Sequence, residues 1–135
     1  MKFKVIEQNS VRKLIGNPKL RFTHQGFVSI NGAGVHKLKL PENAHIIIVQ
    51  DEEKPNDFYL IITEDKKFPR LRKVAGRSRI ASYGSAYHIL CNHFNLPPKI
   101  NFDLGIGGQI KSELGTAHCL ITSKLLELSK EVNHV

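Results

Sequence analysis

Short runs of alternating apolar and polar residues, separated by glycine, proline and asparagine, make up most of the chain. An arm and a short helical turn are expected at residues 2–7 and 11–15. The pattern then predicts two hairpins around a second short helical turn. The expected elements are strands at 20–23 and 27–30, the turn at 35–40, and strands at 44–50 and 58–63.

The second half carries segments of the same kinds. They predict strands at 68–74 and 77–81, a helix from about 85 to 95, strands at 99–104 and 116–122, and a short amphipathic tail at 125–128. Pro97-Pro98 prevents the helix from continuing, and the glycines at 105–108 are expected to break the strand before them.

The two halves share an element order, and an ungapped shift of 50 residues supports a repeat. The shift places Gly26, Ile30, Gly34 and Leu40 on Gly76, Ile80, Gly84 and Leu90. Composition alone gives about one identity over such a stretch; chance agreement between two glycine turns is the alternative. One ββαββ unit is too small to be stable alone, so two units are expected to pair. The predicted fold is α+β, mostly β: two ββαββ repeats (20–63 and 70–122) with short helices, forming one pseudo-two-fold domain within residues 1–135, with terminal extensions 1–19 and 123–135.

Charge indicates an anionic partner. The chain has 135 residues and a net charge of +8. Residues 66–79 contain seven bases and no acid, whereas 46–65 are strongly acidic. Such a balance favours nucleic acid as the partner. The longest apolar run is too short to span a membrane, and with no secretory signal and two cysteines we expect a cytoplasmic protein with no membrane partner.

Residues 20–63, and 70–122 more loosely, resemble the AbrB-type swapped-hairpin DNA-binding module. The likeness runs through the Leu20-Arg21-Phe22-Thr23 strand, the Gln25-Gly26 turn, the return strand, the short helix and the second hairpin. It implies duplex-DNA binding in transcription regulation, and the family's intertwined dimers imply that this chain supplies its own second subunit or forms a homo-oligomer. The chain is also similar to small bacterial proteins with an acidic loop followed by a Phe-Pro-basic segment, a likeness that implies no function.

The candidate site is a set of basic residues expected to lie along phosphates. Arginine binds phosphate oxygens bidentately, and it can also reach guanine edges. The set consists of Lys19, Arg21, Lys66, Lys67, Arg70, Arg72, Lys73, Arg77 and Arg79. DNA is expected over RNA. The alternative is a non-catalytic protein–protein interaction module, or a self-associating structural protein, that uses residues 68–74 as an exposed sheet edge.

Other candidate chemistry is weaker, and we predict no enzyme, cofactor or metal site. His88 and Cys91 share a helix face, but His93 points away from both, so tetrahedral zinc binding is not expected. The glycine-rich stretch at 105–112 lacks the Gly-Lys-Ser order of a phosphate loop. The acids of 51–57 lack the spacing of a calcium loop.

Overall fold

A computed structural model describes residues 17–132, so the arm and helical turn predicted within residues 2–15 lie outside the described part. The first half contains β1 (Lys19–Phe22), β2 (Phe27–Ile30), α2 (Gly32–Leu38), β3 (His45–Gln50) and β4 (Phe58–Thr63). The second contains β5 (Arg72–Lys73), the 3-10 turn η1 (Ala75–Arg77), β6 (Arg79–Ser82), α3 (Gly84–Phe94), β7 (Phe102–Ser112), β8 (Gly115–Ile121) and α4 (Ser123–Val132).

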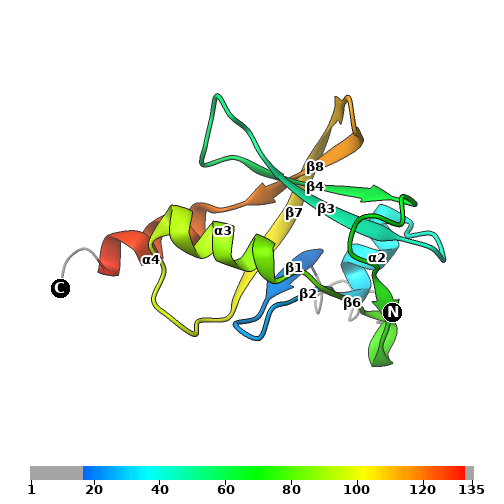
Figure 1. Ribbon diagram of the computed structural model, residues 1–135, viewed down its shortest axis with the longest axis horizontal. Helices are drawn as coiled ribbons and strands as arrows, with labels where there is room; N and C mark the ends of the chain where they lie inside the picture. The colour runs from blue at the N-terminus through cyan, green and yellow to red at the C-terminus, as the bar shows by residue number, and fades with distance from the viewer. Residues whose placement is uncertain (1–16, 133–135) are drawn as a thin grey trace, which may run out of the picture.

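The molecule is mostly β, with 41% strand and 23% helix, which confirms the predicted balance of strands and short helices. All strands belong to one antiparallel, curled sheet with the order β3-β4-β8-β7-β1-β2-β6-β5 (Figure 1). The helix expected at 85–95 is present as α3. Its alanine, leucine and phenylalanine residues recur at helical spacing, and it ends before the two prolines.

The two ends of the strand order meet through the residues just before β5. The Ile46 amide donates to the Pro69 carbonyl at 2.9 Å, and the Leu71 amide donates to the Ala44 carbonyl at 2.9 Å. The segment therefore bonds to β3 on one side, while β5 pairs with β6 on the other. The edge that we expected to be exposed at residues 68–74 is used inside the fold, so strand addition there has no free template.

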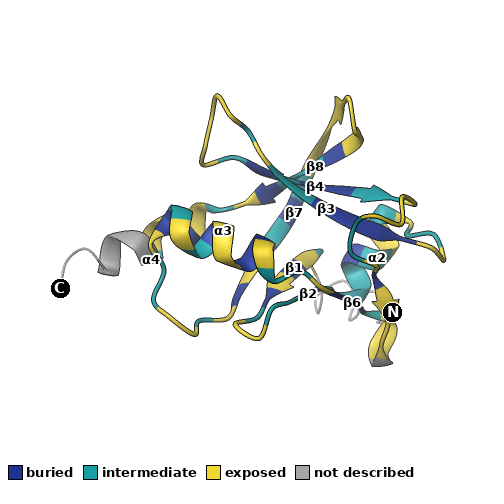
Figure 2. Cartoon of the chain, viewed as in Figure 1, coloured by how far each residue is buried: buried dark blue, intermediate teal, exposed yellow. Residues whose placement is uncertain are grey.

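Apolar side chains from both halves fill the inside of the curled sheet. Leu20 and Phe22 point inward from β1, and the Phe22 ring stacks on Phe102 of β7 with centroids 5.1 Å apart. Tyr87 of α3 stacks on the same Phe102 ring at 5.9 Å, so the helix packs onto this core. Figure 2 shows the result, with buried residues along the strands and the inner side of α3, and exposed residues mainly at loops.

The break expected at the glycines of 105–108 is wrong, because β7 runs through them to Ser112. Gly105 pairs with both Lys19 of β1 and Ile121 of β8. The register shifts between Ile106 and Gln109, which absorbs the next two glycines in an irregularity of the ladder. At Gly105, pairing with strands on both sides compensates for the entropic cost of glycine in a strand.

The shift of 50 residues does not superimpose the two halves. It places Ile30, which is buried, on Ile80, which is half-buried on the other face of its strand. The backbone gives a different correspondence: the Thr23 amide donates to the Phe27 carbonyl at 3.0 Å, and the Val74 amide donates to the Ser78 carbonyl at 3.1 Å. The two turns therefore match at a shift of 51 residues.

Among residues 17–132, no helix is long and apolar enough to cross a bilayer.

Candidate nucleic-acid interface

The outer side of β1, β2, β6 and β5 collects basic residues at its two margins. Lys19 and Arg21 flank the buried Leu20 on β1, so both point outward. Arg70 and Arg72 flank the buried Leu71 in the same way at the other margin, and both are exposed. We call this side, with its four basic residues, the basic face.

Strand pairing places Arg21 and Arg72 in one row across the basic face. Arg21 pairs with Ser29 of β2, Ser29 pairs with Ile80 of β6, and Ile80 pairs with Arg72. The two arginines are thus three strand spacings apart, or about 14 Å measured along the sheet. The predicted bases of the two halves are therefore brought onto a common stretch of sheet.

The sequence carries a signal for this arrangement at a shift of 51 residues, which the shift of 50 does not reveal. Pro18-Lys19-Leu20-Arg21 and Pro69-Arg70-Leu71-Arg72 match at a shift of 51, with three identities and one lysine-for-arginine exchange. The two prolines also have the same backbone role: the Pro18 carbonyl accepts from Ile106 of β7 at 3.0 Å, as the Pro69 carbonyl does from Ile46 of β3.

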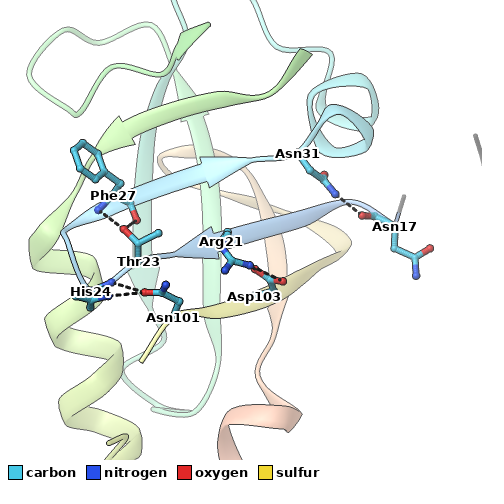
Figure 3. Close-up of polar contacts among 8 residues, drawn as sticks. All are labelled: Asn17, Arg21, Thr23, His24, Phe27, Asn31, Asn101 and Asp103. Atoms are coloured by element: carbon cyan, nitrogen blue, oxygen red, sulfur yellow. Dashed lines mark hydrogen bonds and ion pairs between the residues drawn. The ribbon is translucent and has the colours of Figure 1, made fainter. Parts of the chain in front are cut away.

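Arg21 is the member of the basic face with an acidic neighbour. Its Nη1 lies 3.3 Å from an oxygen of Asp103 on β7, and both side chains are about half exposed, at 53% and 40% (Figure 3). Such an exposed pair contributes about 0–1 kcal/mol. The guanidinium therefore has donors to spare for a phosphate, although the carboxylate competes for them. The other three members have no acidic group within 4.0 Å among the described residues.

Figure 3 also shows how the β1–β2 hairpin is held in place. The Asn31 side chain accepts from the Lys19 amide at 3.0 Å and donates to the Asn17 carbonyl at 2.8 Å. The same oxygen caps α2 by accepting from the Gly34 amide at 2.9 Å. Asn101 accepts from the His24 amide at 2.9 Å, which ties the turn to the residues before β7. The backbone beneath Lys19 and Arg21 is therefore fixed.

Arg79 is not on the basic face, contrary to the sequence prediction that it lies along phosphates. It is only 6% exposed. Its Nη1 donates to the Pro41 carbonyl and its Nη2 donates to the Leu40 carbonyl at 3.4 Å, so the guanidinium holds the link between α2 and β3 against β6. Strand alternation is the physical reason, because Arg79 lies on the inward side of β6, two residues before buried Ala81.

The remaining predicted bases lie away from the row. Lys73 is paired with Glu42 at 2.8 Å, and this hydrogen bond and the lysine charge hold the pKa of the Glu42 carboxyl below its usual value. Lys67 lies 3.7 Å from an oxygen of Asp65, in the loop that follows β4. Lys66 precedes it, and Arg77 ends η1; both are exposed.

The described histidines and cysteines are candidate metal ligands and nucleophiles. Within residues 17–132, no cluster of three or more His, Cys, Asp or Glu side chains is arranged to hold a metal ion. Burial raises the pKa of the Cys91 thiol, which lowers its nucleophilicity at neutral pH. His93 bonds to Asn56 at 2.8 Å, and the Nδ1 atom of His118 is buried without a partner among the described residues. Burial, and secondarily the charge of Lys37, lowers the pKa of His118.

Comparison with family models, curated proteins and solved structures finds no match for this chain. The functional conclusion therefore rests on the geometry of the basic face.

Proposed function

We propose that this protein binds nucleic acid, and specifically duplex DNA, through the basic face, in a role such as transcription control. The observation that carries the proposal is the repetition of Pro-basic-Leu-Arg at the two margins of one stretch of sheet. Phosphates repeat regularly along DNA, and outward arginine and lysine side chains on a fixed backbone are suited to contact them. The net charge of +8 supports the same partner.

We further infer that the two halves are related by an approximate two-fold axis. The support comes from the strand neighbours, counted with the contact between β3 and residues 69–71. The list of neighbouring pairs stays the same when each strand of the first half is exchanged with its counterpart in the second half: β1 with β5, β2 with β6, β3 with β7 and β4 with β8. In this arrangement Lys19 corresponds to Arg70 and Arg21 to Arg72. The axis passes between β2 and β6, which places one basic pair on each side of it.

Salt titration tests the proposal. Binding of a mixed-sequence duplex, followed by fluorescence anisotropy, should weaken with salt at a log–log slope of about −3.6 if four phosphates are contacted. The double variant Arg21→Ala/Arg72→Ala should halve that slope. Lys54→Ala/Lys111→Ala removes the same charge from exposed loop and hairpin positions away from the basic face, and it should change the slope far less.

Two results would refute the proposal: no binding to any duplex, or equal losses in the two double variants. Size-exclusion chromatography of the free chain, run alongside, tests the rival idea of a self-associating module. A dimer whose formation does not depend on the basic face, together with absent DNA binding, would favour that rival.

A further inference from the structure

Between the two basic margins lies an uncharged strip formed by β2 and β6. The outward residues of β2 are Phe27 and Ser29, and those of β6 are Ile80 and Ser82. All four are half-buried or exposed, and Phe27 pairs directly with Ser82 as Ser29 does with Ile80. The strip is thus two strands wide, antiparallel, and able to make both apolar and hydrogen-bonding contacts.

We propose that β2 and β6 enter the major groove of duplex DNA as a two-stranded ribbon, while the basic pairs beside them contact the two phosphate backbones. This inference rests on the proposed function, and it specifies the ligand as B-form DNA and the groove as the major one. This binding mode would give the protein a preference for particular DNA sequences, which contacts with phosphates alone do not provide.

The dimensions of the sheet favour the major groove. That groove is about 12 Å wide and admits a two-stranded ribbon, whereas the minor groove is about 6 Å wide and does not. Arg21 and Arg72 lie about 14 Å apart along the sheet, one beyond each side of the ribbon. Each arginine can therefore reach a different backbone. Because the sheet is curled around its core, its outer face is convex, and the margins fall back on either side of the strip when the strip faces a duplex.

The same dimensions exclude duplex RNA, because the major groove of A-form helices is deep and too narrow for side chains to read.

The chemistry of the strip is suited to base edges in DNA. Ser29 and Ser82 hydroxyls can donate or accept, and Phe27 and Ile80 can contact thymine methyl groups.

Charge distribution supports the same orientation. The contact between β3 and the residues before β5 joins the two ends of the strand order. Around this order, β7 and β1 separate β8 from β2, and β5 and β3 separate β6 from β4. The β2–β6 pair therefore lies opposite the β4–β8 pair. The acidic loop of residues 51–57 joins β3 to β4, and in Figure 1 it lies at the top of the molecule, whereas β2 and β6 lie in the lower half. Duplex DNA on the ribbon is thereby kept away from these carboxylates.

Dimethyl sulfate footprinting of the unmodified protein on a duplex selected from a random pool gives the first test. This reagent methylates guanine N7 in the major groove and adenine N3 in the minor groove. We expect protection of guanine N7 with adenine N3 unprotected. Protection confined to adenine N3, or binding with no base protection, would overturn the ribbon mode and leave the proposed function intact. Absence of binding to every duplex would refute both.

A variant pair gives the second test. Ser29→Ala/Ile80→Ala should raise Kd for the selected duplex by about 5- to 150-fold, if the two single contacts together are worth about as much as one bidentate base contact, which discriminates by about 1–3 kcal/mol. Kd for random duplex and the salt slope should stay unchanged, and circular dichroism verifies that the variant is folded. Arg21→Ala/Arg72→Ala should weaken both duplexes alike and lower the slope. Equal losses on selected and random duplex in the Ser29/Ile80 variant would contradict the proposal, and the footprint decides the matter if that variant does not fold.

Discussion

Replacing Arg79 by methionine removes a buried guanidinium but retains most of the aliphatic volume. The charged group has no carboxylate within 4.0 Å among the described residues, and its donors go to the carbonyls of Leu40 and Pro41. Methionine removes the free-energy cost of burying the charge. It also leaves the two carbonyl oxygens without a donor, which costs about 1–3 kcal/mol for each. One of the two hydrogen bonds is long, at 3.4 Å. The expected loss is therefore about 2 kcal/mol in the free energy of unfolding.

Arg72→Met is the matched control, because it removes the same charge from the neighbouring strand at an exposed position. Its free energy of unfolding should stay within about 0.5 kcal/mol of the parent value. Its salt slope for DNA binding should drop by about 0.9, since one phosphate contact is lost. Arg79→Met should leave that slope unchanged under conditions in which it is folded.

Urea unfolding followed by circular dichroism measures the first quantity, and fluorescence anisotropy at several salt concentrations measures the second. A loss of 2 kcal/mol corresponds to a decrease of about 8 °C in Tm for a domain of this size. The assignment of Arg79 to the interior is refuted if Arg79→Met keeps its unfolding midpoint and loses DNA affinity as Arg72→Met does.

Three further predictions concern charge and pH. Asp103→Asn removes the carboxylate that pairs with Arg21, so DNA affinity should rise by about two- to fivefold. Asp57→Asn in the acidic loop is the control and should have a smaller effect. Equal effects of the two variants would contradict the idea that Asp103 competes with phosphate for Arg21. Burial raises the pKa of Tyr87 to about 12, so the native state retains the proton longer than the unfolded chain does, and stability should fall as pH rises above 10. Tyr87→Phe should lose about 1 kcal/mol at neutral pH with its hydrogen bond and should show less of this alkaline decline in urea titrations; an identical alkaline slope would refute the assignment. Burial lowers the pKa of His118, so the unfolded chain takes up the proton first and Tm should fall as pH drops through 6.5. His118→Gln should flatten that part of the Tm profile, and a profile that matches the parent would exclude His118 as its source.

Local patterns in the sequence predicted most of the elements but not how they connect at the margins. The β-branched run at residues 46–49 and the helical spacing of α3 were sufficient to predict β3 and the helix. Residues 68–74 also alternate, yet regular strand is restricted to Arg72–Lys73, because Pro69 cannot donate to a ladder and the pairing of the preceding residues with β3 is limited to an isolated bridge at Arg70. Closure of the sheet is a long-range event that no local pattern encodes.

The sequence predicted a set of basic residues, and the structure places four of them on one face of the sheet and Arg79 in the interior. A count of bases cannot separate Arg72, which points outward, from Arg79, which points inward, because the difference depends on the strand register. A one-residue error reverses the side on which every side chain lies. The shift of 50 made such an error: it aligned Gly26 with Gly76, and both have a positive φ, whereas the hydrogen bonds of the two turns align Gly26 with Arg77, whose φ is 66°.

The correspondence at a shift of 51 residues separates two demands that the proposed DNA binding would make on the two halves. Contact with phosphates requires only positive charge at a fixed spacing, and the two margins meet it with the same Pro-basic-Leu-Arg segment. Reading of bases requires particular chemistry at each position, and there the halves differ, because Ser29 corresponds to Ile80. A site read in this way should therefore be symmetric in its protected phosphates and asymmetric in its bases. A palindromic consensus from random-pool selection would contradict that expectation, since it would require equivalent side chains on the two strands of the ribbon.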